Sequence, residues 1–315
     1  MEKLDGKLHS IKNEIEGVFS SIDPAVFDFK RNYFNPSGKA VRSRFTLLFS
    51  SALGLENKKA EELSICSELV HTSSLLHDDC IDGSSMRRGS PTINARFGVN
   101  TAILLGDLIM AVAFKRADSL SRDTSSELVA AVKKMAEGAL LEENFKYKKI
   151  SAGDYEKMVS LKTSALFRWS ALSACYLSKN GLFAESSLIA EAFGLSFQIT
   201  DDVIDLEEGA DAGKERLKDI TGGKITMPLL LALKDEKISA PLMEKLNAFL
   251  ESGICDISAA HEMADLIREN GCLEKAREKA KALIEGVGKE ILRLPEKNEA
   301  VNLYNYLYSL SRRKS

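Results

Sequence analysis

The sequence predicts an all-α fold in which one large helical bundle surrounds a cavity. Long segments carry apolar residues at positions i, i+3, i+4 and i+7, which is the pattern of amphipathic helices. Only six prolines interrupt the 315 residues. Segments with strand-like alternation are absent, and so are the two-residue turns that would join strands into hairpins. Together these observations favour helices throughout the chain.

The apolar periodicity predicts twelve helices in chain order. The prolines fall between these helices or in their first turns, as expected for a residue that cannot donate a backbone hydrogen bond. The expected ranges are 8–20, 38–53, 58–82, 100–120, 124–149, 153–178, 182–208, 225–234, 240–252, 257–270, 273–292 and 297–312.

The length of these helices also indicates how the chain is organised. Several exceed twenty residues, which is longer than the average helix of globular proteins. No stretch has the composition of a linker, and no repeat of 20–50 residues recurs. Residues 1–315 are therefore expected to form a single all-helical domain.

Charge and cysteine content narrow the class of protein. The 43 Lys and Arg residues nearly offset the 46 Asp and Glu residues, which argues against a protein that coats nucleic acid. Five scattered cysteines without a CxxC pair form neither a disulfide framework nor a zinc pattern, and they suit a reducing cytoplasm.

Targeting and membrane signals are not found in the sequence. The N-terminus lacks the apolar core of a secretory signal. The most apolar stretch, residues 101–114, is interrupted by Asp107 and is too short to span a bilayer. We therefore expect a cytoplasmic protein without a transmembrane segment.

The strongest local motif is HDDCID at residues 77–82, near the end of a predicted helix. Asp78 and Asp82 stand one helical turn apart on the same face, and Asp79 flanks them. Three such carboxylates repel one another unless a cation lies between them, and their hard oxygen atoms suit Mg²⁺. A solvated acidic helix end would explain this motif if it stood alone.

A second acidic cluster repeats this spacing far along the chain. Asp201, Asp202 and Asp205 lie in an otherwise apolar helical stretch. Acidic side chains on an apolar helix face are costly unless they bind something. If the two clusters face each other across a bundle, they would hold a site for several metal ions.

Several basic residues could complete such a site by binding phosphate. Taken singly, each is most often a surface charge, but as a set they combine forked Arg donors, Lys ammonium groups and glycines that allow close approach. They are Lys39 and Arg42, Arg87-Arg88-Gly89, Lys162-Thr163, and Lys214 and Lys224 beside glycines.

The order and flanks of these motifs resemble the trans-isoprenyl diphosphate synthase (polyprenyl synthetase) family, particularly its long-chain members. The resemblance covers roughly residues 35–230. Its anchors are Gly38-Lys39 with Arg42, HTSSLLHDDCIDGSSMRRGSPT at 71–92, Lys162-Thr163, FQITDDVID at 197–205 and GKERLKDITGGKITMP at 213–228.

The resemblance implies an all-helical fold with a deep central cavity and a homodimer. The implied reaction is the head-to-tail condensation of isopentenyl diphosphate with an allylic diphosphate, with two or three Mg²⁺ ions per active site. It also implies a peripheral membrane contact for product release.

The resemblance further implies a role for each motif residue. The isopentenyl diphosphate would be bound by Lys39, Arg42, His71 and Arg88. The allylic diphosphate would be contacted by Arg87, Lys162, Gln198, Lys214 and Lys224, with Thr163 beside them. Mg²⁺ would be bound by Asp78, Asp79, Asp82, Asp201, Asp202 and Asp205.

Two segments depart from the pattern of the family. The chain has Lys-Ala-Val-Arg-Ser at 39–43, where relatives usually carry Lys-Arg-Leu-Arg-Pro. It also has Ala139 and Glu142 where many relatives carry Glu or Gln and then Gln. Because Lys39 and Arg42 are retained, we still expect binding of the diphosphate.

Two other readings share this fold. A non-catalytic regulatory subunit typically lacks one aspartate cluster, whereas both are whole in this chain. A class I terpene cyclase normally replaces the second cluster and needs no isopentenyl diphosphate site. A chain-elongating prenyltransferase accounts for more of the motifs than either.

The helix before the first cluster predicts the length of the product. The allylic tail is expected to run along the side chains one to three turns before Asp78, and none of these is aromatic. A long product of C30 or more is therefore expected, and a short-chain C15–C20 synthase is the alternative. The side chains along the expected path are Ser74, Ser73, Val70, Cys66 and Ser67, and Met135 or Leu128 would close its end.

Overall fold

The computed structural model describes residues 2–29, 38–207, 217–252 and 256–313. The chain divides into two compact units, which are described separately. Unit 1 comprises Met1–Val132, Leu166–Ser187 and Arg293–Leu303. Unit 2 comprises Lys133–Ala165, Leu188–Leu292 and Tyr304–Ser315. The assignment of the whole chain to a single domain stays a prediction.

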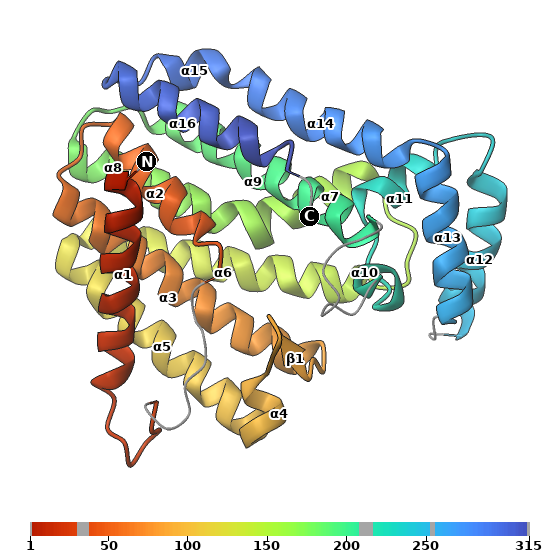
Figure 1. The fold of residues 1–315 in the computed structure, drawn as a ribbon, viewed down its shortest axis with the longest axis horizontal. Helices are drawn as coiled ribbons and strands as arrows, with labels where there is room; N and C mark the ends of the chain where they lie inside the picture. Colours follow the sequence, from red (N-terminus) through yellow and green to blue (C-terminus); the bar gives the residue numbers. More distant parts are fainter. Residues whose placement is uncertain (1, 30–37, 208–216, 253–255, 314–315) are drawn as a thin grey trace. The chain divides into compact units, whose positions relative to one another are not determined.

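Unit 1 is built around α3, which packs against α1, α2 and α5 (Figure 1). Apolar side chains of α2 and α3, among them Phe45 and Leu69, are fully buried in this unit. Its helices are α1 (Glu2–Ser20), α2 (Val41–Ala52), α3 (Asn57–Ile81), α4 (Ile93–Phe97) and α5 (Val99–Leu120), with parts of α6 (Arg122–Phe145) and α8 (Ala165–Ser178).

A short antiparallel hairpin follows α3, formed by β1 (Met86–Arg87) and β2 (Ser90–Pro91). Its two-residue turn has positive φ at both positions, 52° at Arg88 and 75° at Gly89. The prediction that no hairpin turn occurs is wrong at this place. Two-residue hairpin turns are usually recognised in a sequence by Asn-Gly or Asp-Gly. The Arg88-Gly89 pair does not match this pattern, because arginine rarely adopts the left-handed conformation.

Unit 2 has its own apolar core, in which Tyr155, Val203 and Met263 are almost entirely buried. Helix α11 packs against α14, and α13 contacts α10, α11, α12 and α14. The helices of this unit are α7 (Ala152–Val159), the π-helix η1 (Ser160–Ser164), α10 (Lys218–Thr221), α11 (Met227–Ala232), α12 (Ser239–Ser252), α13 (Ile257–Glu269), α14 (Cys272–Gly286) and α15 (Gly288–Leu292). It also contains most of α9 (Phe183–Leu206) and parts of α6 and α16 (Lys297–Leu310).

The all-α prediction is confirmed, and several predicted helices differ in their bounds or their continuity. The helix expected at 8–20 begins at Glu2, and the one expected at 124–149 ends at Phe145. The helix expected at 153–178 changes to π geometry over Ser160–Ser164, and the one expected at 273–292 breaks at Val287. The short helices α4 and α10 were not predicted. They hold too few residues for an apolar period to be recognised.

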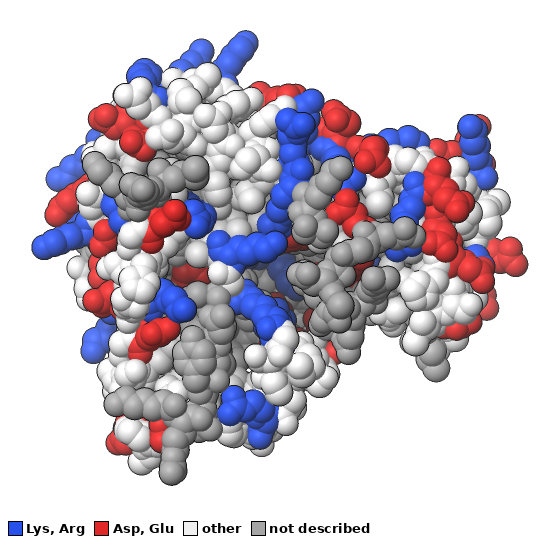
Figure 2. Space-filling view, viewed as in Figure 1, with Lys and Arg blue, Asp and Glu red and all other residues white. Residues whose placement is uncertain are grey.

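Charged side chains of both signs are interspersed on the face shown in Figure 2. Within the described ranges, each helix is either too short or too polar to cross a membrane. Four cysteines, at positions 66, 80, 175 and 272, are free, and Cys255 lies outside the described residues.

Candidate active site

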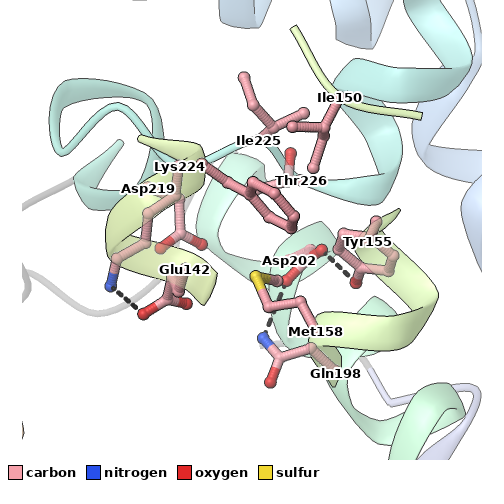
Figure 3. A pocket seen from close by; sticks show the side chains of 11 residues that line it. Glu142, Ile150, Tyr155, Met158, Gln198, Asp202, Asp219, Lys224, Ile225 and Thr226 are labelled. Carbon is pink, nitrogen blue, oxygen red and sulfur yellow. Dashed lines mark hydrogen bonds and ion pairs between the residues drawn. The ribbon is translucent and has the colours of Figure 1, made fainter. Parts of the chain in front are cut away.

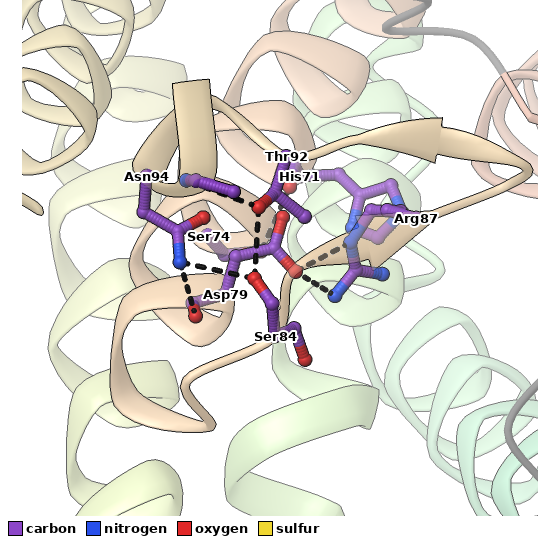
Figure 4. A network of polar contacts seen from close by, with 8 residues as sticks. His71, Ser74, Asp79, Ser84, Arg87, Thr92 and Asn94 are labelled. Atoms are coloured by element: carbon purple, nitrogen blue, oxygen red, sulfur yellow. Dashed lines mark hydrogen bonds and ion pairs between the residues drawn. The ribbon is translucent and has the colours of Figure 1, made fainter. Parts of the chain in front are cut away.

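The first aspartate cluster lies at the C-terminal end of α3 in unit 1. Asp78 and Asp79 are in its last turn, and Asp82 is its C-cap. Asp79 is buried, and its Oδ1 accepts hydrogen bonds from Arg87 Nε at 2.8 Å and Nη2 at 2.7 Å (Figure 4). Asn94 Nδ2 donates to the carbonyl oxygen of Asp79, and so holds the following loop against the cluster.

Arg42, His71 and Arg88 are grouped in the same unit. Burial lowers the pKa of Arg42 to about 10, and Glu68 opposes this effect. Burial also holds the pKa of His71 well below its ordinary value, and the positive charges of Arg42, Arg88 and Arg87 act in the same direction. His71 is therefore neutral at pH 7 and lies among three cationic side chains.

Two nitrogen atoms of this group have no hydrogen-bond partner within the described residues. Arg42 Nε and His71 Nδ1 are buried and unpaired. Buried polar atoms without a partner are rare unless a ligand or water satisfies them. A Cβ atom on Gly38 would lie 2.5 Å from Cζ of Arg88, so a larger residue there would displace this guanidinium from its present position. Lys39 follows Gly38 and is exposed. The arrangement suits a bound anion.

The second aspartate cluster lies near the end of α9 in unit 2. Asp202 is buried and accepts hydrogen bonds from Tyr155 Oη at 2.6 Å, from the Met227 N–H at 3.0 Å and from Gln198 Nε2 at 3.0 Å. Burial raises the pKa of Asp202 to about 6, although these hydrogen bonds favour its charged form. Gln198 in turn accepts from Thr163 Oγ1 at 2.9 Å. Thr163, Gln198 and Asp202 are thus linked in one chain.

The other two aspartates of this cluster have different partners. Arg313 forms an ion pair with Asp201 and lies 4.6 Å above the ring of Phe197. Asp205 Oδ2 accepts from the backbone N–H of Asp219 at 3.3 Å. Burial, then the charges of Asp205 and Asp202, raise the pKa of Asp219 to about 8.

Lys162 and Thr163 both lie in the π-helix η1. Single π turns inside longer helices are rare and are often found at functional sites. Close packing accompanies this one, because a Cβ atom on Gly138 would lie 2.7 Å from Lys162 Cα. Similarly, a Cβ atom on Gly194 would lie 2.6 Å from Ser164 Cα. The two glycines allow α6 and α9 to contact the backbone of η1.

A small pocket that is open to solvent lies beside these residues in unit 2 (Figure 3). Glu142, Gln198, Asp202 and Lys224 line its polar side. Apolar side chains line the remainder, among them Phe145, Ile150, Met158 and Ile225.

The predicted site residues thus fall into two groups. Unit 1 contains Lys39, Arg42, His71, Asp78, Asp79, Asp82, Arg87 and Arg88. Unit 2 contains Lys162, Thr163, Gln198, Asp201, Asp202, Asp205 and Lys224, and Lys214 lies outside the described residues. Among the described residues, no three Asp, Glu, His or Cys side chains are already arranged to bind a metal ion. In this state Asp79, Asp201 and Asp202 are paired with protein donors instead.

Sequence reasoning missed several partners of these residues. Glu68 lies three positions before His71. It is a single acidic residue among uncharged neighbours, so no motif indicates that it belongs to the site. Asp219 lies in the quoted 213–228 motif and was not selected. Tyr155 and Arg313 bind Asp202 and Asp201 only through the tertiary fold, so no local spacing points to them.

Comparison with known proteins identifies the family. The polyprenyl synthetase family model matches residues 24–262. The geranylgeranyl pyrophosphate synthase of Geoglobus acetivorans is 32% identical over 311 residues, covering 94% of this chain and 95% of its own. An all-trans-nonaprenyl-diphosphate synthase of Rhodobacter capsulatus is 29% identical, covering 92% and 89%.

A solved structure is also similar over nearly the whole chain. The geranylgeranyl pyrophosphate synthetase of Pyrococcus horikoshii is 30% identical, with a TM-score of 0.84, covering 99% of this chain and 98% of its own. Since the family model spans most of the chain and the relatives match it from end to end, this protein belongs to the polyprenyl synthetase family and is a chain-elongating prenyltransferase.

Proposed function

We propose that this enzyme condenses isopentenyl diphosphate head to tail with an allylic diphosphate in a Mg²⁺-dependent reaction. The observation that carries the proposal is the buried group of unit 1, where Arg42 Nε and His71 Nδ1 have no hydrogen-bond partner among the described residues. Charge-assisted hydrogen bonds to a diphosphate would satisfy both atoms.

Each diphosphate has its own set of residues in this proposal. Isopentenyl diphosphate is bound by Lys39, Arg42, His71 and Arg88. The allylic diphosphate is contacted by Arg87, Lys162, Thr163, Gln198 and Lys224, and by Lys214 outside the described residues. The lowered pKa of His71 supports its role as a neutral imidazole that shares a hydrogen bond with a phosphate oxygen.

The proposed metal ligands are the carboxylates of the two clusters, with two or three Mg²⁺ ions per site. The donor set supports this choice, because carboxylate oxygens without thiolate or imidazole favour a hard cation. Bound Mg²⁺ would neutralise the charge that builds on the diphosphate as its bond to carbon breaks. The residues are Asp78, Asp79, Asp82, Asp201, Asp202 and Asp205.

The remaining chemistry needs few protein groups. The double bond of isopentenyl diphosphate attacks the allylic carbon as the diphosphate departs, and the departing diphosphate accepts the final proton. Thr163 and Gln198 are linked to Asp202 by hydrogen bonds, so their dipoles are held in fixed orientations. No side-chain nucleophile is required.

We further propose a long product of C30 or more. The name of the nonaprenyl relative supports a long chain, whereas the names of the two archaeal relatives make C20 the alternative. Incubation with Mg²⁺, isopentenyl diphosphate and each allylic primer in turn tests both the reaction and the length. Formation of no elongated product from any primer would overturn the proposal.

A homodimer is also part of the proposal. Helix α5 exposes three apolar side chains, Val99, Ile103 and Leu104, and contact with a second copy would cover them. Sedimentation equilibrium of the wild type and of Leu104→Glu distinguishes a dimer from a monomer. A cytoplasmic location, with a peripheral membrane contact at product release, completes the proposal.

A further inference from the structure

Glu142 is an acidic side chain on the polar side of the pocket in unit 2. It lies near the end of α6, and its side chain is 16% exposed. Its Oε2 accepts a hydrogen bond from Lys162 Nζ at 2.5 Å. The same oxygen lies 3.9 Å from Lys224 Nζ, a contact that Figure 3 shows. One carboxylate oxygen therefore lies close to two ammonium groups, which come from different segments of the chain.

The backbone around Glu142 fixes this arrangement. Gly138 lies one helical turn before Glu142 and contacts the backbone of Lys162, with no space for a Cβ atom. The π geometry of η1 places Lys162 at this contact. On the other side, the Tyr147 N–H donates to the carbonyl oxygen of Gly223, the residue before Lys224, at 2.8 Å. The three charged groups are thus held together by main-chain packing as well as by their own attraction.

The charges of this group have a simple consequence. Without an anion between them, the ammonium groups of Lys162 and Lys224 would repel each other in a partly buried setting. Glu142 supplies that anion in the free protein. A diphosphate on the same two lysines supplies it in the complex, and the carboxylate of Glu142 then competes with the diphosphate for them.

We propose that Glu142 is a positioning residue for diphosphate release: it holds Lys162 and Lys224 in the free enzyme and takes them back as inorganic diphosphate leaves. No covalent bond changes in this exchange, and all three side chains keep their charges. The inference rests on the proposed function, in which the two lysines contact the allylic diphosphate.

Chain elongation makes this exchange useful in every cycle. Each condensation leaves inorganic diphosphate where the diphosphate of the lengthened chain must bind next. A carboxylate that weakens the binding of inorganic diphosphate to the two lysines would speed its release. A glutamine at this position would accept a hydrogen bond from lysine but bring no charge, so it would hold the lysines without competing for them.

The variant Glu142→Gln tests the charge alone, because the amide keeps the shape and the acceptor atom. Binding of inorganic diphosphate to the enzyme in saturating Mg²⁺ is measured by isothermal titration calorimetry. We expect binding about tenfold tighter than in the wild type, the effect of one charge-assisted contact that is no longer contested. Inhibition by added diphosphate should strengthen by the same factor.

The adjacent acid provides the matched control. Glu143 is exposed and pairs with Lys146, one turn away on the same helix, at 2.5 Å. Glu143→Gln should leave diphosphate binding and inhibition unchanged. Glu142→Asp keeps the charge and should restore weak diphosphate binding, which a merely structural role of the side chain would not predict. Melting temperatures of all variants report whether each one is folded.

Kinetics separate release from chemistry. In Glu142→Gln, steady-state elongation should slow by a larger factor than the rate of a single condensation measured under single-turnover conditions. Unchanged or weaker diphosphate binding in this variant would overturn the inference. Lys162→Gln tests the proposed function separately: if it binds diphosphate like the wild type, the assignment of the lysine is wrong. If Lys162→Gln weakens the binding of inorganic diphosphate while Glu142→Gln leaves it unchanged, the inference on Glu142 is wrong and the proposed function stands.

Discussion

Ser43 donates two hydrogen bonds to a single oxygen of Glu68, one from its backbone N–H at 3.0 Å and one from its hydroxyl at 2.9 Å. Both residues are buried. Ser43 lies in the first turn of α2, where the backbone N–H has no partner within the helix. A proline at this position would have no N–H to donate. Ser43 therefore anchors the carboxylate of Glu68, whose charge acts on Arg42 and Arg88.

Replacing Ser43 should weaken isopentenyl diphosphate binding selectively. Ser43→Pro removes both hydrogen bonds and leaves Glu68 buried with unsatisfied acceptors, which costs roughly 1–3 kcal/mol if it is not relieved by movement. We expect the KM for isopentenyl diphosphate to rise about tenfold, corresponding to about 1.4 kcal/mol, and the KM for the allylic substrate to stay constant. Ser64→Ala is the control, since that hydroxyl bonds only within α3, to the Ala60 carbonyl oxygen. Equal changes in both KM values would contradict the expectation.

Removing Arg313 should strengthen metal binding at the second cluster. Its guanidinium pairs with Asp201, so a metal ion must displace it to reach that carboxylate. Because the Asp201 side chain is 42% exposed, we expect a gain of less than about fivefold in Mn²⁺ affinity for Arg313→Gln. Calorimetry without substrates measures it. Arg312→Gln is the control, because Arg312 lies over Tyr308. A gain of the same size in both variants would point to net charge alone.

Metal removal should abolish turnover. Asp78→Ala and Asp201→Ala should each lower kcat by several orders of magnitude, because each removes a proposed Mg²⁺ ligand. Both variants should keep their helical circular dichroism. The expectation fails if the wild type is fully active in excess EDTA.

The length of the product should depend on Ser74. Ser73 is fully buried, and its hydroxyl donates to the Gly106 carbonyl oxygen on α5 at 2.7 Å, so a large side chain there would separate α3 from α5. Ser74 is partly exposed and bonds only within its own helix, to the His71 carbonyl oxygen. Ser74→Phe should therefore shorten the product without loss of stability, as read by chromatography of the dephosphorylated prenols. A wild-type product of C15 or C20 that the substitution leaves unchanged would show that this face of α3 does not set the length.

The free energy of unfolding should decrease as the pH is lowered below about 6.5, because His71 is buried in its neutral form. The pKa of His71 is lowered by burial and by the surrounding arginines, whereas in the unfolded chain it returns to about 6.5. Below that value the unfolded chain binds a proton that the folded chain does not, so the free energy of unfolding decreases as the pH falls. His71→Gln removes this proton uptake, and its urea midpoint should decline less between pH 6.5 and 5 than that of the wild type. Parallel declines would contradict the assignment.

Much of the fold could be predicted from the sequence because helices follow from short-range patterns. The expected ranges 58–82 and 182–208 match α3 and α9 to within two residues at each end. Apolar spacing of three and four residues is a property of one helical turn, so neighbouring residues carry the signal. The same reasoning places Asp78 and Asp82 on one face of α3, and Asp201 and Asp205 on one face of α9.

The geometry within each of the two groups of site residues depends on contacts between residues far apart in the chain, so it follows from the tertiary structure. The π turn at Lys162 occurs where Gly138 and Gly194 let neighbouring helices approach its backbone. Lys162 lies 20 residues from Glu142, and Arg313 lies 112 residues from Asp201. The residue types of the site and the helices that carry them follow from hydrophobic periodicity and motif spacing, which are local features of the chain. The pairing of each carboxylate with its cation depends on the folded state, because such pairs form only after packing has brought distant segments together. Packing also removes the water that would otherwise screen their charges.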